Sequence, residues 1–569
     1  MDSDMMHPEE TELTTPLPGK GGERGTRRQT WLHVGFLVVL CAVLFFYRSG
    51  SLPLADPEEA RCALIVRHML RTGDWMVPHV DDEVYFDKPA PYFWLAALGE
   101  KLTGSAELGG RGVAAFSGIL AVLLTYAFGR RVFGPTAGLL AGVVLATSGE
   151  FLFIARWFRM DMPFAAATWG ALWCFWRSEA PSNPPAASRR AGWYGFYALC
   201  AVGTLFKGPV SLVLPVMIVA LYLLLSVRPR RVFELLHPGG ILLYLLIAAP
   251  WYVVISLREP AYAYEFFIRQ HIVRYAIRNV GHQGLPGVLY VPILLGGLVP
   301  WTLFLAGAGI RYFPRRWRLR AASPGVLLLW LSSLVPFIFF AFSERKLAHY
   351  ILPVFPPLAV LIGGVVAAWI AFQEVGWRSK LGTLSLLSAA LLLVPAALVA
   401  EIWLGNLDTW FALPAAAVAV ALTGMTVSLR RGRRGACVAW ASAAVVTMLL
   451  YFIGHTSPAI YERMSTRSLA RLVDPAARAT AKLCCWDTRK LSFVYYTHAA
   501  EVERFRHSTP GDLEKLVKLL QSGQTVYCLV CDQERLDELK RACPGGFSIL
   551  GQSGDRSIIT NRPASGTRD

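Results

Sequence analysis

The chain has 569 residues, of which 54% are hydrophobic and 17% are charged, and its mean hydropathy is +0.43. This composition excludes one large soluble protein with a hydrated surface and indicates an integral membrane protein. The formal net charge of +17 is compatible with nucleic-acid binding, but the basic residues lie in short clusters between apolar segments, as topology signals and lipid contacts do. We therefore expect membrane lipids among the partners and no nucleic acid.

The apolar segments predict an all-α polytopic domain. Residues 1–30 are polar, and the segment 31–48 has no small-residue cleavage site behind it, so we interpret it as an uncleaved anchor. Twelve more segments of membrane-spanning length follow, at 111–129, 133–149, 162–177, 191–206, 209–227, 239–257, 287–307, 324–342, 347–371, 381–401, 408–428 and 436–454. The region 31–455 is thus expected to form about 13 transmembrane helices, with a long outer loop at 49–110.

Charge decides the expected orientation. The loops that follow the even-numbered segments are basic, for example RPRR at 228–231, RYFPRRWRLR at 311–320 and RRGRR at 430–434. The positive-inside rule places these loops and residues 1–30 in the cytoplasm. The alternate loops and the region 456–569 are then expected on the outer side, which collects every polar segment with a candidate site.

The first outer loop contains ADPEEARCALIVRHMLRTGDW at 55–75, which predicts a helix. A purely structural interpretation is available, because Asp56 can cap this helix, Glu59 can complete a capping box and Gly73 can end it. Against it, Glu58 and Arg61 are one helical turn apart beside a second charged segment, YFDKP at 85–89. Both interpretations stay open for this segment.

Other charged residues lie at the expected outer ends of the spans. Asp161 begins the fourth span, and Lys207, Arg269, His271, Arg274 and Lys346 follow in later outer segments. Each cation alone can be an interface anchor whose head reaches water. Together they indicate a cleft that suits a lipid-linked phosphate, with a carboxylate able to act as general base on an acceptor.

The region 456–569 differs in character from the rest of the chain. KLSFVYYT at 490–497, TVYCLVC at 525–531 and SIITN at 557–561 predict strands, whereas PGDLEKLVKLLQSG at 510–523 and QERLDELKRAC at 533–543 predict helices. We expect a small α/β domain on the outer side. Its five cysteines, Cys484, Cys485, Cys528, Cys531 and Cys543, would lie where disulfides are permitted.

Several of these motifs carry a family resemblance. PEEARCALIVRHMLRTGDW, YFDKPAPYFWL, RMDMP, FKGP and RKLAHYILPVFPPLAVLIG resemble the successive signatures of the aminoarabinose-transferase-like branch of the GT-C glycosyltransferases, relatives of the protein O-mannosyltransferases. The similarity runs from about residue 31 to 372. It implies transfer of a sugar, aminoarabinose by preference, from a polyprenyl-phosphate carrier to lipid A or another envelope acceptor. It also implies inversion at the anomeric carbon, and an inner-membrane enzyme whose active site lies on the outer, periplasmic side.

The first-loop motif departs from the family pattern. Where the family usually has Asp-Glu-x-Arg-Tyr, this chain has Glu58, Glu59, Ala60, Arg61 and Cys62. The expected aspartate is a glutamate, and Asp56 stands two residues earlier and can substitute. Which carboxylate faces the acceptor stays open, so all three acids are candidates.

The resemblance implies two sets of site residues. The catalytic candidates are Glu58, Asp161, Asp56 and Glu59, and the candidates for binding the donor phosphate and sugar are Arg61, Tyr85, Lys88, Lys207, Arg269, Lys346 and Tyr350. Asp87 stands where the family usually has a glutamate. Asp87 and His271 form either part of a divalent-ion site, for zinc or magnesium, or an ordinary hydrogen bond or ion pair between two outer loops.

Other functions are compatible with the same residues. A hexose or uronate donor, or a protein hydroxyl as acceptor, would use the same chemistry. From a different class, the chain could be a transporter or flippase of a lipid-linked sugar, although such proteins often contain internal repeats and we detect none here. A purely structural envelope protein would leave the shared outer position of the acids and lysines unexplained.

Overall fold

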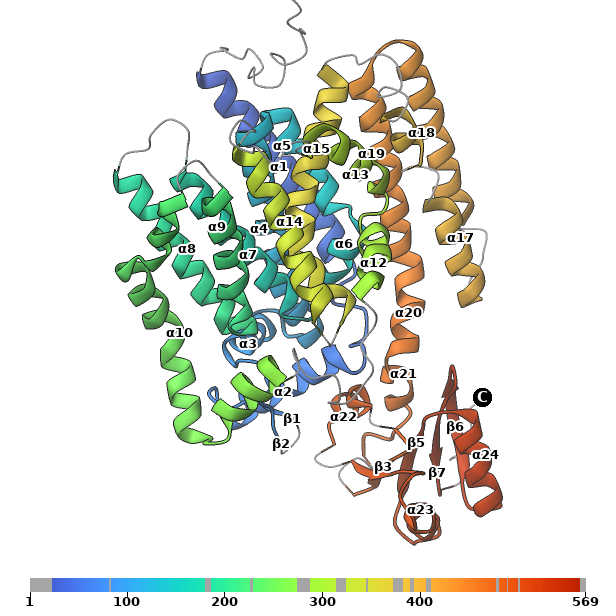
Figure 1. Cartoon of the computed structure of the whole chain (residues 1–569). Coiled ribbons are helices and arrows are strands. Elements are labelled where there is room, and N and C mark those ends of the chain that lie inside the picture. The colour runs from blue at the N-terminus through green and yellow to red at the C-terminus, as the bar shows by residue number, and fades with distance from the viewer. Residues whose placement is uncertain are drawn as a thin grey trace, which may run out of the picture.

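The structure is a computed structural model. It describes residues 23–562 except for 81–82, 180–185, 226–228, 274–286, 314–323, 344–345, 372–381, 389–392, 406–410, 477–479, 489 and 500–501. Helices dominate as far as residue 464, and a small mixed sheet follows them. Figure 1 shows this sheet beyond one end of the helical bundle, and the N-terminal end of α1 near the opposite end.

The bundle is built from helices that cover the expected spans. They are α1 (Glu23–Phe46), α4 (Ala106–Phe133), α5 (Pro135–Ala146), α6 (Gly149–Ala155), α7 (Asp161–Ser178), α8 (Ala186–Lys207), α9 (Val210–Leu225), α10 (Pro238–Arg258), α12 (Tyr290–Gly297), α13 (Thr302–Tyr312), α14 (Pro324–Phe342), α15 (Phe355–Ala371), α17 (Leu393–Leu404), α18 (Ala412–Arg430) and α19 (Arg434–Tyr451). The shorter turns are η1 (Pro229–Leu236), η2 (Tyr264–Val273), η3 (Gly287–Leu289), η4 (Ala348–Val354) and η6 (Phe452–Thr456).

These helices make the chain a multi-pass membrane protein. Within the described residues, seven helical segments are long and apolar enough to cross a membrane, or nine if each bent pair is one span. The bent pairs are α5 with α6, at 68°, and α12 with α13, at 106°. The other expected spans fall on shorter or less apolar helices such as α7, α8 and α9, so the polytopic fold is confirmed while thirteen crossings stay a prediction.

The first outer loop folds over one end of the bundle. It contains α2 (Glu58–Thr72), β1 (His79–Val80), β2 (Glu83–Val84) and α3 (Pro91–Thr103). The predicted C-terminus of α2 is confirmed, because Gly73 has φ +76° and its N–H donates to the carbonyl of Met69. The prediction that Asp56 caps α2 is wrong, because its side chain accepts hydrogen bonds from Ser492 instead.

The C-terminal part is the expected α/β domain. Its elements are α20 (Ser457–Met464), α21 (Arg467–Ala470), β3 (Lys482–Trp486), α22 (Leu491–Thr497), β4 (Glu503–Phe505), α23 (Asp512–Leu520), β5 (Val526–Val530), α24 (Gln533–Ala542), β6 (Ser548–Ser553) and β7 (Arg556–Thr560). The strand order is β4-β3-β5-β7-β6. Strand β3 is parallel to both β4 and β5, whereas β7 is antiparallel to β5 and β6. All ten cysteines are free.

One predicted strand of this domain is a helix. The segment KLSFVYYT forms α22, although its β-branched and aromatic residues favour a strand locally. Leu491, Val494 and Tyr495 are spaced as on one face of a helix, and they pack against the apolar cluster of the first outer loop. Phe493 packs against the sheet instead. Burial on two sides thus overrides the local preference.

Candidate active site

Asp161 is the centre of a buried charge cluster. It is the first residue of α7 and is 1% exposed. Lys207 Nζ, at the end of α8, donates to Oδ1 at 2.6 Å, and Arg159 Nε donates to Oδ2 at 2.7 Å. His349 Nε2, from η4, lies 3.9 Å from Oδ2. The carboxylate is thus bound to two cations, and it fixes both of them in place.

Lys207 is also enclosed by aromatic rings. Its Nζ lies 4.4 Å from the ring centroid of Phe164 and 5.0 Å from that of Tyr350. Cation–π contacts of this kind stabilise an ammonium that is away from water. Tyr350 therefore lies beside the cluster, and its role in donor binding stays a prediction.

Glu58 is the acid of the first loop that faces this cluster. Its Oε2 accepts a hydrogen bond from Arg61 Nη1 at 3.2 Å and lies 3.8 Å from Arg159 Nη1. Its side chain is 33% exposed, whereas that of Asp161 is only 2% exposed. Arg159 lies between the two acids and interacts with both. Glu58 therefore combines contact with the cluster and access from outside.

Glu59 has a structural role. Its Oε1 accepts hydrogen bonds from Arg111 Nε and the Phe158 N–H, both at 2.9 Å. Its Oε2 accepts from Arg111 Nη2 at 2.6 Å and from the Ala55 N–H at 3.0 Å. Both side chains are fully buried, so this carboxylate joins α2 to α4 and has no access to a substrate.

Asp56 points toward the C-terminal domain. Its Oδ1 accepts from the Ser492 N–H at 2.8 Å, and its Oδ2 accepts from the Ser492 hydroxyl. Burial raises the pKa of Asp56, although the hydrogen bonds from Ser492 act in the opposite direction. The geometry thus separates three acids among which the sequence left the choice open, and it favours Glu58, the acid from which we expected most.

Lys88 lies beside the same cluster, between β2 and α3. Its charge interacts with those of Asp87, Lys207 and Asp161. Burial lowers the pKa of Lys88, and the nearby Asp87 partly opposes that effect. Within the described part of the chain, no hydrogen bond or ion pair engages its ammonium group. Lys88 therefore offers a half-buried positive charge to an anionic ligand.

Tyr85 and Asp87 are close neighbours of Lys88 in the first loop. The Arg61 guanidinium lies 5.9 Å from the Tyr85 ring centroid, and burial raises the pKa of Tyr85. Asp87 Oδ1 accepts a hydrogen bond from Gln270 Nε2 at 2.5 Å, which joins the first loop to η2. A hydrogen bond thus joins these two loops through Gln270, whereas the expected pairing of Asp87 with His271 stays a prediction.

The divalent-ion site stays a prediction. The side chain of His271 lies outside the described residues, so its distance from Asp87 is undefined. Among the residues that the structure describes, no group of three or more His, Cys, Asp or Glu side chains is placed to hold a metal ion.

Two expected donor-binding residues are not joined to the cluster. Arg269 is exposed and forms an ion pair with Glu265, one helical turn away, at 3.0 Å. Lys346 is half-buried, and no ion pair among the described residues joins it to Asp161 or Glu58. The site as described is therefore built from the first loop, the 156–161 turn, α8 and η4.

Sequence reasoning did not single out three residues of this arrangement. Arg159 stands two positions before Asp161 in the quoted RMDMP signature, and His349 lies within RKLAHY, so both were visible as neighbours of a motif. Arg111 carried a weaker signal, because an arginine at the start of an apolar segment is usually an interface anchor. Its burial against Glu59 depends on how α2 packs on α4.

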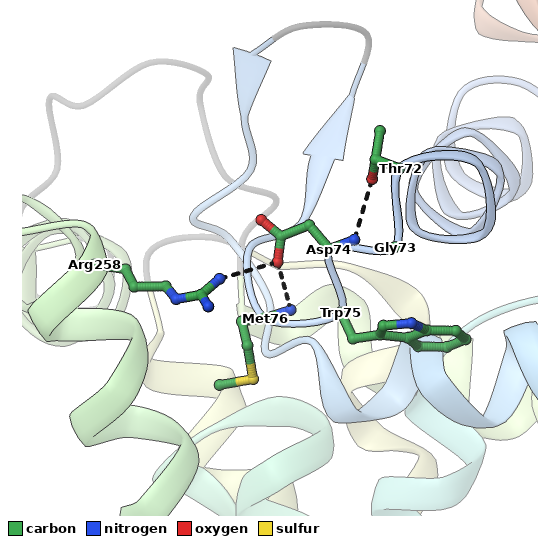
Figure 2. A pocket seen from close by; sticks show the side chains of 6 residues that line it. All are labelled: Thr72, Gly73, Asp74, Trp75, Met76 and Arg258. Carbon is green, nitrogen blue, oxygen red and sulfur yellow. Dashed lines mark hydrogen bonds and ion pairs between the residues drawn. The ribbon is translucent and has the colours of Figure 1, made fainter.

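A separate shallow pocket of about 430 Å³ lies where α2 and α10 end. Thr72, Gly73, Asp74, Trp75, Met76 and Arg258 line it. Figure 2 shows that Asp74 Oδ1 accepts from Arg258 at 3.3 Å and from the Met76 N–H at 2.9 Å. This pocket is lined by one acid and one base, whereas the Asp161 cluster brings together charged groups from several segments, so we assign the chemistry to the Asp161 cluster.

Comparison with known proteins gives matches along much of the chain. The family model described as dolichyl-phosphate-mannose-protein mannosyltransferase matches residues 87–254. An undecaprenyl phosphate-alpha-4-amino-4-deoxy-L-arabinose arabinosyl transferase of Edwardsiella ictaluri is 35% identical over 331 residues, which are 57% of this chain and 58% of that protein. A transferase of the same description from Pseudomonas fluorescens is 33% identical over 366 residues, 62% of this chain and 63% of that protein. The chain thus spans about three fifths of the length of these relatives.

A solved structure extends the fold comparison to nearly the whole chain. The crystal structure of ArnT from Cupriavidus metallidurans bound to undecaprenyl phosphate aligns with a TM-score of 0.73 at 22% identity, over 93% of this chain and 98% of that one. The resemblance found in the sequence motifs is confirmed: this chain is similar in sequence to the aminoarabinose arabinosyl transferases over about three fifths of its length, and it has the polytopic fold of ArnT.

Proposed function

We propose that this chain is an inverting glycosyltransferase of the cytoplasmic membrane that takes its sugar from a polyprenyl-phosphate carrier. The sugar favoured by its relatives is 4-amino-4-deoxy-L-arabinose, and the favoured acceptor is lipid A or another envelope glycan. One observation carries the proposal. Glu58, which is accessible, and Lys88, whose ammonium has no partner in the described structure, lie beside one buried cluster centred on Asp161.

Inversion, which the resemblance implies, corresponds to a direct displacement. The acceptor oxygen attacks the anomeric carbon from the side opposite the phosphate, the bond between that carbon and the phosphate oxygen breaks, and polyprenyl phosphate leaves with the electron pair. Negative charge grows on the leaving phosphate, where Lys88 stabilises it. Glu58 accepts the proton of an acceptor hydroxyl, or orients an acceptor phosphate that is already ionised.

Asp161 has a different part in this scheme. Because it is buried and bound to Lys207 and Arg159, it is poorly placed to take a proton from an acceptor. It keeps the two cations oriented, and Arg159 in turn reaches Glu58. We infer that Asp161 sets the electrostatic field of the site. No step is assigned to a divalent ion, because Asp87, the described candidate ligand, is bound to Gln270.

The proposed location is the outer, periplasmic side of the inner membrane. In support, the turn between α18 and α19, which carries the basic residues 430–434, lies at the end of the bundle opposite the C-terminal domain (Figure 1). The Asp161 cluster lies toward the same end as that domain, since Glu58 is two residues from Asp56, which Ser492 binds.

The direct test uses purified protein in proteoliposomes with radiolabelled undecaprenyl phosphate-aminoarabinose and lipid A. Transfer of label to lipid A, with a mass increase of one pentosamine, is the expected result. Hexose and uronate donors and a protein acceptor, run in parallel, define the specificity. Vesicle uptake of the donor without cleavage would replace the proposal with a transporter.

A matched pair of variants ties activity to the site. Lys88→Ala is expected to abolish transfer or to raise the donor KM by about 100-fold, because an anionic leaving group loses a fixed cation. Lys101→Ala is the control, since Lys101 is a lysine of the same loop that lies over Trp75, 5.4 Å from its ring centroid. Equal activity of the two variants would remove Lys88 from the mechanism.

A further inference from the structure

Helix α22 lies between the first outer loop and the C-terminal sheet. It contacts α2 on one side and α21 on the other. Leu491 and Val494 are buried in the apolar cluster of the outer loop, whereas Phe493 is buried in a cluster of the C-terminal domain. A displacement of one cluster is passed through such a helix to the other, because tightly packed interiors deform little.

The polar contacts of α22 converge on the residues just before α2. Ser492 is fully buried, and both its N–H and its hydroxyl donate to the carboxylate of Asp56. The Thr466 N–H donates in turn to the Ser492 oxygen at 3.0 Å. The Asp56 N–H donates to the Met464 carbonyl at 2.9 Å, so that the backbone and side chain of Asp56 are both held by the C-terminal part.

Two tyrosines extend this attachment on both sides of Glu58. The Tyr496 hydroxyl accepts from the Leu54 N–H at 2.7 Å and donates to Glu107 Oε1 at 2.8 Å. Further along α2, Arg67 Nη1 donates to the Tyr495 carbonyl at 2.9 Å. The segment just before α2 and the second half of α2 are therefore both tied to α22.

Among the described residues, Glu58 itself makes no hydrogen bond or ion pair with α22, and it faces the Asp161 cluster. It is separated from Asp56 by one residue, in the first turn of α2. We propose that α22 is a positioning element for the reaction: Ser492, by holding Asp56, fixes the first turn of α2 and thereby the orientation of Glu58 toward the acceptor. This inference rests on the proposed function, but it concerns residues that do not touch the substrate.

The test compares two serines of the C-terminal domain. Ser492→Ala removes a hydroxyl that binds Asp56, whereas Ser522→Ala removes an exposed hydroxyl that donates to the Leu519 carbonyl within the same domain. Ser492→Ala is expected to lower kcat by about 10- to 100-fold, because small displacements of a reacting group are costly. The donor KM should stay within about twofold of wild type, since no hydrogen bond or ion pair in the described part of the chain joins Lys88 or Lys207 to α22. Ser522→Ala should match wild type in both.

A conservative variant and a structural measurement complete the design. Ser492→Thr keeps the hydroxyl and is expected to restore most of kcat. Hydrogen exchange of residues 54–62 should speed up in Ser492→Ala and not in Ser522→Ala. An unchanged kcat in Ser492→Ala would overturn the proposal, as would a kcat loss that Ser492→Thr shares or that comes without faster exchange at 54–62.

The exchange measurement also separates the two proposals. If the wild-type protein transfers no sugar, the proposed function fails. Faster exchange at 54–62 in Ser492→Ala would then still show that α22 orders the first turn of α2, and unchanged exchange would refute that link as well.

Discussion

At the scale of single residues, adjacent acids have opposite roles. Glu58 and Glu59 follow each other on α2, and successive helical positions face different directions. One of them reaches Arg159 at the site, whereas the other is fully buried against Arg111. The same carboxylate group is thus accessible at position 58, whereas at position 59 it holds α2 against α4.

Charge removal at these two positions should therefore have different effects. Glu58→Gln is expected to lower kcat by at least about 100-fold and to leave the thermal midpoint near wild type, since the side chain is partly exposed. Glu59→Gln should lower the stability by about 3–5 kcal/mol, because it leaves Arg111 buried without its charge partner. Turnover assays and thermal unfolding in detergent measure both effects. A stable Glu59→Gln protein would contradict the structural role.

A change at Asp161 should lower both turnover and stability. Asp161→Asn keeps the volume but leaves the Lys207 and Arg159 charges without their shared partner, so both turnover and the thermal midpoint are expected to fall. Asp161→Glu keeps the charge and serves as the matched variant. Full activity of Asp161→Asn would remove the central carboxylate from the site.

The pKa of Lys88 predicts how donor affinity depends on pH. Only the protonated ammonium attracts a phosphate, and burial lowers the pKa of Lys88 below the ordinary value of a lysine. The donor KM should therefore rise as the pH increases through this lowered pKa, at a lower pH than an ordinary lysine would cause. Lys88→Arg, which stays charged, should move the rise to higher pH. A KM profile identical in both proteins would contradict this assignment.

At the scale of elements, helix ends were easier to predict than contacts. The glycine that ends α2 and the helices α23 and α24 follow from local chemistry, and all three are found. The α22 segment was misassigned because its local preference competes with burial on two faces, which no local pattern reveals. The choice of Glu58 over Asp56 also depends on contacts across the fold, above all the bonds from Ser492 to Asp56.

Gly73 offers a test at this scale. Its φ of +76° strains any residue with a Cβ, although nothing lies within 4 Å of the added atom. Gly73→Ala is expected to cost about 1 kcal/mol, seen as a lower thermal midpoint. Gly35, inside α1 with open space around it, is the control, and its change to alanine should not lower the midpoint. Equal midpoints for Gly73→Ala and wild type would contradict the left-handed helix end.

At the scale of the whole molecule, the sequence predicted the multi-pass architecture and the small α/β domain, because composition and hydropathy carry that information. The convergence of α2, α7, α8 and η4 at Asp161 came from family resemblance, since no periodicity shows which span ends meet. The packed structure was needed to show how this site is completed by Arg111, Arg159 and His349.

Orientation in the membrane is the prediction that belongs to this scale. Cysteines placed at Ser508, in the C-terminal domain, and at Arg431, in the α18–α19 turn, should react differently with a membrane-impermeant thiol reagent in intact spheroplasts. Ser508→Cys should be labelled, and Arg431→Cys should be labelled only after lysis. Wild type serves as the background, because most of its cysteines are buried. The reverse pattern would invert the proposed topology.

The bond between Asp56 and Ser492 spans 436 positions of the chain, and this separation has a consequence for biogenesis. The ribosome completes the first outer loop early, but the helix that closes its apolar cluster is synthesised near the end. Until residues 491–497 are in place, Glu59 still joins α2 to α4, but Asp56 lacks its bonds to Ser492 and α2 lacks its contacts with α22. Under the proposed positioning role, the membrane domain is thus inserted before Glu58 is fully oriented, and a nascent chain that stalls short of α22 would occupy the membrane without the complete site.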